Sequence, residues 1–149
     1  MDFDYKNVTV YIDKNNDLYF VPHGIWTTHD VTAEINDILD LKYPYTLEEL
    51  EFAIKESFGR CYSQYVDRDF PKVTAIEKHL KVKGYKKAVK KKKIVGLHWD
   101  EEGYQVIPIT YTVKKGYVHQ EEKTFFLGKE LNEFYLAEAL LKAISLSEI

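Results

Sequence analysis

Three runs rich in β-branched and aromatic residues follow one another late in the chain and limit what it can fold into. They cover Ile94–Asp100, Tyr104–Val113 and Val118–Leu127, and the polar, glycine-containing segments DEEG and KKG separate them. Runs of this composition, interrupted by turn residues at hairpin spacing, are typical of an antiparallel meander. We therefore expect a three-stranded meander around which the rest of the chain packs.

Pro108 lies in the central run of this meander. Proline has no N–H group to donate, so strands accept it mainly at edges and bulges. The sequence leaves two alternatives: a bulge at Ile107–Ile109, or a strand that is partly open on one side. An open side could accept a strand from a partner protein.

The first forty residues predict a β-hairpin followed by a helix. Val8–Asp13 alternates in hydrophobicity, and a KNND turn leads into a second short run, Leu18–Pro22, which Pro22 and Gly24 should end. Thr27–Leu41 has apolar residues at helical spacing, so we expect a helix there, although its β-branched content disfavours one.

Two capping boxes predict where further helices begin. Thr46 is followed three residues later by Glu49, and Thr74 by Glu77, the pattern that satisfies the free N–H groups of a first helical turn. The first helix should run to about Gly59 or Tyr62, and the second should stop near Gly84.

The last helix is predicted at Lys129–Ser147, where a wide apolar stripe suits packing across a sheet. Tyr85–Lys92, just before the meander, is too charged for a buried strand. Together these elements predict an α+β fold for residues 1–149, a single domain. Its antiparallel sheet should consist of the N-terminal hairpin and the C-terminal three-stranded meander, packed with three to four helices.

Charge is strongly segregated along the chain. Residues 81–93 hold eight lysines and no acid, whereas the other 136 residues carry 13 basic and 24 acidic side chains. An acidic body of this kind attracts a basic partner and repels nucleic acid except at the lysines. One alternative function is therefore a nucleic-acid-binding accessory protein that uses Lys86–Lys93. We expect no direct nucleic-acid contact, because no nucleic-acid-binding motif is present.

Three features of the sequence bear on the cellular compartment of the protein and on its association with membranes. The single cysteine excludes an internal disulfide and fits a reducing cytoplasm. The first residues, MDFDYKNVTV, lack the basic and apolar regions of a signal peptide, and no segment has the roughly 20 apolar residues of a membrane span. We expect a cytoplasmic protein without a membrane partner.

Five histidines and one cysteine invite a search for chemistry. None has the local spacing of a metal site, and we expect no metal and no cofactor. His98, His119 and Cys61 define an enzyme alternative, a small hydrolase or nucleic-acid-modifying enzyme, with the Arg60 cation beside the thiol. We expect no enzyme, because nothing in the sequence brings these side chains together, and so we assign no catalytic residue.

Recognition of a partner is the function that the composition favours. The chain has 12 tyrosines, and tyrosine supplies a large contact area with a polar end. With an acidic body and no catalytic motif, the meander becomes the expected docking surface. The residues that we predict to contact a partner are His98, Tyr104, Pro108, Tyr111, Tyr117, His119, Glu121 and Glu122.

Residues 46–147 resemble a bacterial protein family in three stretches. These are the lysine-rich lead-in YKKAVKKKKIV, the proline-bearing hairpin YQVIPITYTVKKGY and the closing helix ELNEFYLAEALLKAISLS. This layout is similar to that of the immunity proteins of contact-dependent growth-inhibition systems. The resemblance implies a cytoplasmic inhibitor of one cognate toxin domain, often a nuclease, whose β-hairpin extends the sheet of the immunity protein in some members.

Overall fold

The computed structural model describes residues 4–26, 31–66, 74–112, 116–119 and 121–147. Its centre is a nine-stranded sheet with the main order β3-β2-β1-β6-β7-β8, to which β4 and β5 add beside β2 and β9 beside β7. Every strand pair is antiparallel except β2 with β5. The strands are β1 Lys6–Ile12, β2 Leu18–Trp26, β3 Val31–Glu34, β4 Leu39–Leu41, β5 Tyr65–Val66, β6 Lys93–Asp100, β7 Gly103–Thr112, β8 Gly116–His119 and β9 Phe125–Gly128.

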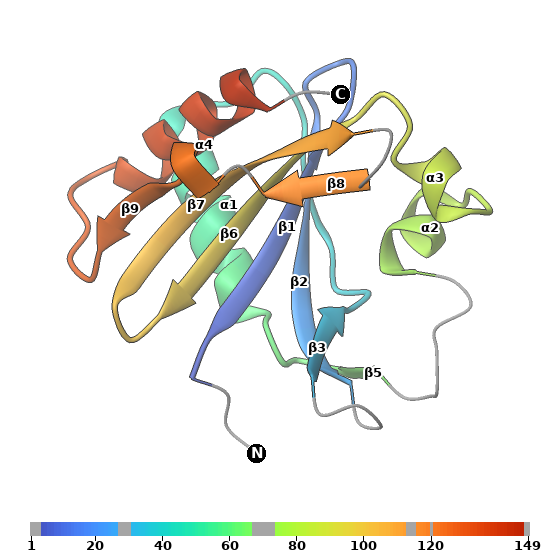
Figure 1. Cartoon of the computed structure of the whole chain (residues 1–149), viewed down its shortest axis with the longest axis horizontal. Helices are drawn as coiled ribbons and strands as arrows, with labels where there is room; N and C mark the ends of the chain where they lie inside the picture. The colour runs from blue at the N-terminus through green and yellow to red at the C-terminus, as the bar shows by residue number, and fades with distance from the viewer. Residues whose placement is uncertain (1–3, 27–30, 67–73, 113–115, 120, 148–149) are drawn as a thin grey trace.

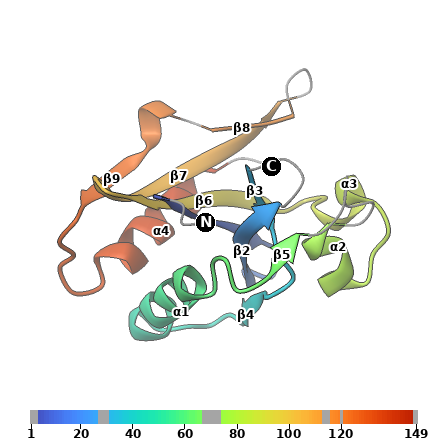
Figure 2. The same ribbon diagram turned by 90° about the horizontal axis from the view of Figure 1, so that it is seen from below.

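Two helices cover one face of the sheet, and two short ones pack on part of the other. Figures 1 and 2 show the short pair at one end of the sheet. The helices are α1 Leu47–Gly59, α2 Ala75–Leu80, α3 Tyr85–Ala88 and α4 Tyr135–Leu146, with a 3-10 turn, η1, at Glu121–Lys123. α1 and α4 pack on each other and on the central strands, whereas α2 and α3 lie at one end of the opposite face. The α+β fold class is therefore confirmed, with an antiparallel sheet and four helices.

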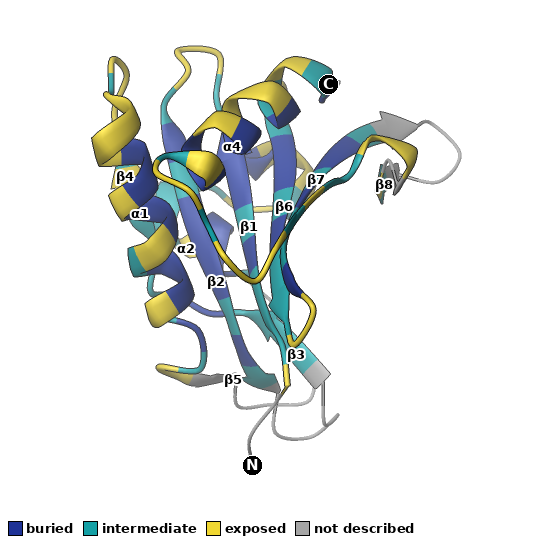
Figure 3. Cartoon of the chain, turned by 90° about the vertical axis from the view of Figure 1, so that its left-hand side faces the viewer, coloured by how far each residue is buried: buried dark blue, intermediate teal, exposed yellow. Residues whose placement is uncertain are grey.

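The hydrophobic core follows this division into two faces. The larger cluster lies under α1 and α4 and includes Val10, Phe20, Leu50, Val95 and Leu140. A smaller cluster on the opposite face gathers around Tyr11, Ile76 and Ile94 under α2 and α3. In Figure 3, α1 and α4 are buried on the sides that face the sheet and exposed on their outer sides. Burial of the apolar stripes on α1 and α4 is the main stabilisation expected for this layer.

The N-terminal hairpin and the first capping box are confirmed. Val10 pairs with Phe20 across β1 and β2. Thr46 Oγ1 accepts the Glu49 N–H at 3.0 Å, and Glu49 Oε1 accepts the Thr46 N–H at 3.0 Å. β2 continues past Pro22 and Gly24 to Trp26. The prediction that these two residues end the strand was wrong, because β3 and β5 pair with its far end.

The helix predicted at Thr27–Leu41 was wrong. Among its described residues, β3 and β4 are strands that pair with β2. Residues 27–30 lie outside the described part of the chain. The apolar residues there fit helical spacing, but long-range pairing with β2 decides the structure, and β-branched residues such as Val31 and Thr32 suit a strand.

The second and last helices are shorter than predicted. The Thr74 capping box is present, but α2 ends at Leu80, before the stop that we expected near Gly84, and Lys81 adopts the left-handed conformation (φ 58°) at its end. Gly84 instead precedes α3, so part of the charged run at Tyr85–Lys92 is helical. α4 begins at Tyr135, whereas we expected a helix from Lys129.

The predicted meander exists, but its third strand is divided. The run Val118–Leu127 forms part of β8, then η1, then β9, and both strands pair with β7. The charged residues of η1 break the alternation that a continuous strand needs. The described residues include no helix with the length and hydropathy needed to cross a membrane.

Candidate protein-docking surface

The outer side of β7 is only partly paired. β9 pairs with residues 104–106 and β8 with residues 109–112, so among the described residues Ile107 and Pro108 have no strand partner on this side. On the other side β7 pairs continuously with β6, including Val95 with Pro108. The irregularity in pairing lies between Tyr104 and Gln105, so the alternative of a bulge at Ile107–Ile109 was wrong. The missing strand pairing agrees with the alternative of a partly open side, but η1 contacts β7, so acceptance of a partner strand there stays a prediction.

Strands β8 and β9 form the free end of the sheet, which we call the β8/β9 end. Each is four residues long and, among the described residues, pairs with β7 alone. β8 extends away from the layer that carries α1 and α4 (Figure 3). Exposed backbone N–H and C=O groups at such an edge can pair with a strand from another chain.

Several predicted contact residues lie at the β8/β9 end. His119 ends β8 and is exposed, and Glu122 is exposed in η1. Glu121 begins η1. Tyr111 and Tyr117 are directly paired across β7 and β8. These five residues therefore belong to one short stretch of sheet edge, and their contact with a partner remains a prediction.

The other three predicted residues lie elsewhere. Pro108 is buried. Tyr104 packs on the larger core cluster, with its ring centroid 5.6 Å from that of Phe58 on α1. His98 lies on the opposite face of β6 and is separated from β8 by β7. The sequence alone did not show on which face of the sheet each of the eight predicted contact residues lies.

Phe126 is a surface residue that the sequence analysis did not single out. Its side chain is 72% exposed, the largest fraction among the exposed large hydrophobic residues described. It lies on β9 opposite Gln105 of β7. An exposed phenylalanine on an open strand is a good anchor for a protein contact, because its burial in a complex removes a large apolar area from water.

His98 is held in a polar triad on the open face of the sheet. Its Nδ1 lies 2.6 Å from Asn7 Oδ1, and its Nε2 lies 3.0 Å from Asp100 Oδ2. Asp100 also accepts the Glu102 N–H, and this bond, together with the contact to His98, lowers the pKa of the Asp100 carboxyl. The triad links the start of β1 to the turn between β6 and β7, and both ring nitrogens of His98 already have a polar partner.

A second polar cluster joins β1, β2, β3 and α3. The Tyr11 hydroxyl donates to Glu34 Oε2 at 2.5 Å and lies 3.0 Å from the Tyr85 hydroxyl. Thr9 Oγ1 is hydrogen-bonded to His23 Nε2 at 2.9 Å, and His23 is paired with Glu34 across β2 and β3. These contacts attach the edge strand β3 and the short helix α3 to the sheet.

Burial shifts the pKa values of Glu34 and His23, two titratable groups of this cluster, in opposite directions. Burial raises the pKa of Glu34 to about 7, opposed by hydrogen bonds from Tyr11 and Thr9. Burial lowers the pKa of the His23 imidazole to about 4. Both groups therefore favour the neutral form in the folded protein.

These shifts predict compensating effects of pH on stability. Between pH 4.5 and 7 the unfolded Glu34 ionises while the folded one keeps its proton, so Glu34 lowers the free energy of unfolding as pH rises. Between pH 6.5 and 4 the unfolded His23 takes up a proton that the folded one does not, so His23 lowers the free energy of unfolding as pH falls. In the wild type the two slopes oppose each other.

Single substitutions should separate the two contributions. In Glu34→Gln we expect the free energy of unfolding to fall by about 1–2 kcal/mol on acidification from pH 6.5 to 4, since both residues retain some solvent exposure. In His23→Gln we expect a similar fall as pH rises from 4.5 to 7. Urea unfolding across this pH range measures both, and parallel profiles for the two variants would contradict the assignment.

The residues of the enzyme alternative are not brought together. Cys61 is buried under the helical layer, its thiol donates to the Asn7 carbonyl at 3.4 Å, and burial raises its pKa. Arg60 bonds Glu56 and Asp37 instead of activating the thiol. His98 lies on the other face of the sheet. Among the described residues no group of three or more histidine, cysteine, aspartate or glutamate side chains could hold a metal ion.

The lysine-rich segment Lys86–Lys93 is only partly available to a ligand. Lys92 Nζ donates to the Ala88 carbonyl at 2.6 Å, and Lys93 Nζ donates to the Ile144 carbonyl in the last turn of α4 at 3.1 Å. The second bond suits a cation at a helix C-terminus. The exposed part of Lys86–Lys93 is four lysines in and just after α3: Lys86, Lys87, Lys90 and Lys91.

The sequence matches no protein-family model and no curated protein. The fold, however, is similar to solved structures over nearly the whole chain. One is a protein of unknown function, NMB0488, from Neisseria meningitidis, with a TM-score of 0.70 and 11% identity over 99% of both chains. Another is a chain of the CdiA-CT/CdiI toxin and immunity complex from Yersinia pseudotuberculosis, with a TM-score of 0.69 and 8% identity over 97% of this chain and 98% of that one. At these identities the similarity establishes a shared fold.

Proposed function

We propose that this protein is an immunity protein that binds and neutralises a cognate toxin domain by direct protein–protein contact. The observation that carries the proposal is the shared fold with a chain of a toxin and immunity complex, which extends over 97% of this sequence. The family resemblance of residues 46–147 agrees with this reading. A cytoplasmic location and a nuclease as the toxin are parts of the proposal.

The β8/β9 end is the surface that we assign to the toxin. It combines two short open strand edges, the exposed ring of Phe126 and a polar rim formed by His119 and Glu122. An apolar anchor surrounded by polar groups is the usual composition of a protein interface. Strand addition at β8 or β9 would supply main-chain hydrogen bonds, and a tight complex would bury about 1,200–2,000 Å² in total.

Charge supports a basic partner. Outside residues 81–93 the chain carries 24 acidic and 13 basic side chains. A nuclease domain needs positive charge to hold a phosphate backbone. An acidic inhibitor would therefore be steered toward such a domain, which raises the association rate and makes it sensitive to salt.

Coexpression tests the proposal directly. The chain is produced together with the toxin domain encoded immediately upstream, and a tag on the toxin is used for purification. We expect the two proteins to copurify as a stable complex. The proposal fails if no toxin-like neighbour is encoded there, or if the two proteins do not copurify.

Phe126→Ser tests the assigned surface. Because the ring is exposed, the substitution should leave the fold intact, and we expect it to weaken the complex by about 10-fold or more as an anchor residue. Isothermal titration with the purified toxin domain measures the change. Leu141→Ser, at a 41% exposed position on α4, is the matched control and should bind as the wild type does. Equal affinities for both variants would move the toxin site away from β9.

A further inference from the structure

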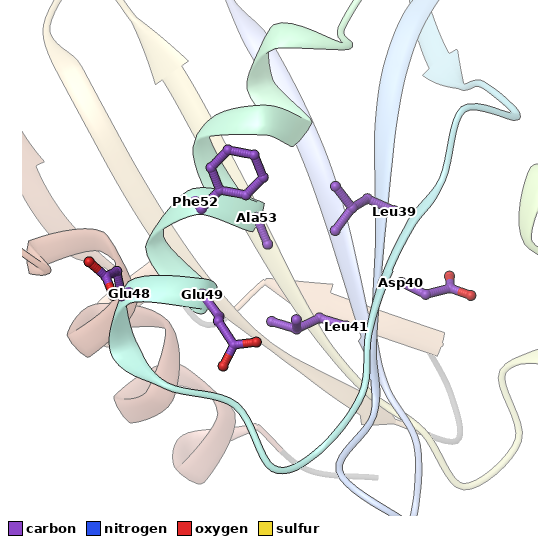
Figure 4. Close-up of a pocket in the computed structure, with 7 residues that line it drawn as sticks. All are labelled: Leu39, Asp40, Leu41, Glu48, Glu49, Phe52 and Ala53. Atoms are coloured by element: carbon purple, nitrogen blue, oxygen red, sulfur yellow. The ribbon is translucent and has the colours of Figure 1, made fainter.

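A groove lies between strand β4 and helix α1 on the side of the molecule opposite β8 (Figures 2 and 4). Its volume is about 480 Å³, and most of its accessible surface is apolar, although Asp40, Glu48 and Glu49 also line it. Leu39 and Leu41 point from β4 toward the helix, while Phe52 and Ala53 form the other wall (Figure 4). We call this feature the β4/α1 groove.

The surface around the groove is unusually apolar for an exposed region. Phe52 is 67% exposed although it lies in the middle of α1, and Tyr43 and Leu47 are 58% and 37% exposed. The core contacts of α1 are made by other residues, including Leu50, Ile54 and Phe58. The fold therefore does not require an aromatic residue at position 52, and clustered exposed apolar side chains mark an interaction site.

The charge around the groove is negative. Residues 37–60 contain six acidic side chains, two lysines and one arginine. The three cations are already paired, Lys42 with Asp17, Lys55 with Glu51, and Arg60 with both Asp37 and Glu56. Glu48 and Glu49 lie on the first turn of α1 beside the apolar lining, and both are exposed. An apolar slot with carboxylates at its rim complements a segment that carries both an apolar side chain and basic ones.

We propose that the β4/α1 groove is a second docking surface, which takes a cationic amphipathic segment of a partner protein. An apolar side chain of that segment enters between Leu39 and Phe52, and its lysine or arginine side chains face Glu48 and Glu49. Nucleic acids and anionic membranes are disfavoured here, because the rim repels phosphate. The proposal does not depend on the toxin site, since β4 and α1 lie on the other side of the sheet from β8.

The test uses a defined probe: a synthetic peptide of about 14 residues in which leucine and lysine are placed at amphipathic helical spacing. It is titrated into the isotope-labelled protein at low salt and followed by amide chemical shifts. We expect saturable shifts concentrated at residues 39–41 and 48–53. A peptide with glutamate in place of each lysine should cause none, because it meets the same rim with like charge.

Two variants make the test specific. Phe52→Ser removes the apolar wall and should weaken peptide binding by about 10-fold, and Glu48→Lys should weaken it by a smaller factor that disappears at high salt. Leu141→Ser alters an equally accessible apolar residue on α4 and should leave binding unchanged. Retained amide dispersion shows that each variant is folded.

Three results would overturn the inference: no saturable shifts up to about 1 mM peptide, shifts centred away from the groove, or unchanged affinity in Phe52→Ser. The proposed toxin site is tested separately. Phe52→Ser should bind the toxin with wild-type affinity, whereas Phe126→Ser should bind it about 10-fold more weakly. The groove can therefore fail while the immunity function stands, and the reverse also holds.

Discussion

Replacing Gly103 by alanine is expected to destabilise the protein by about 3–5 kcal/mol, a large part of the stability of a domain of this size. Gly103 has a φ of +118°, which a side chain disfavours. A Cβ placed there would lie 2.1 Å from the Gly128 carbonyl carbon and 2.6 Å from the Lys129 nitrogen. These are backbone atoms at the end of β9, so the contact cannot be relieved by a side-chain rotation.

The consequence should be local as well as global. Because Gly103 begins β7 beside the end of β9, the added methyl group pushes β9 away from the sheet and displaces Phe126. Urea unfolding measures the loss of stability. Gly59→Ala is the matched control, because nothing lies within 4 Å of a Cβ at Gly59, and it should be neutral or stabilising by up to about 1 kcal/mol. Similar stability of Gly103→Ala and wild type would contradict the close packing of β9 on the β6–β7 turn.

The second large effect is expected at Glu51, which joins the two helices of the covering layer. Its side chain is 7% exposed, and Oε1 accepts the Ala137 N–H at 2.8 Å in the first turn of α4. Phe134, the N-cap residue of α4, makes no side-chain hydrogen bond to the first turn of this helix. The other oxygen, Oε2, has no hydrogen bond and faces Lys55 Nζ at 3.6 Å. Glu51 therefore caps α4 from another helix.

Glu51→Ala should cost about 2–3 kcal/mol, because it leaves a buried N–H group without an acceptor and removes a negative charge from a helix N-terminus. Glu51→Gln keeps an acceptor oxygen and should cost less. Thermal or urea unfolding measures both. Glu48→Ala, one turn earlier and exposed, should change stability by less than about 0.5 kcal/mol. If Glu51→Ala is as mild as Glu48→Ala, the cap does not contribute.

The sequence correctly predicted the elements that depend on interactions between residues close together in the chain. The capping boxes at Thr46 and Thr74 depend on residues three positions apart, and both are present in the structure. The first hairpin and the β6–β7 pair follow from alternation around a short turn. Pro108 was also informative. It has no N–H group to donate, and it lies where the strand partner of β7 changes from β9 to β8.

Long-range pairing was the part that the sequence did not show. Residues 31–41 have helical spacing, but pairing with β2 makes Val31–Glu34 and Leu39–Leu41 strands. For the same reason the β4/α1 groove could not be predicted, since one of its walls was assigned to the wrong element. Phe126 was read as one residue of a continuous strand, and its exposure appears only once that strand is divided by η1.

We propose that this chain inhibits a toxin by binding it one to one. The most direct measurement is the activity of the purified toxin domain encoded upstream while the purified chain is titrated into it. We predict that activity falls linearly and is lost at one equivalent, and that Phe126→Ser shifts this titration to higher concentration. Undiminished toxin activity at a large excess of the folded chain would show that the chain is not the inhibitor of this toxin.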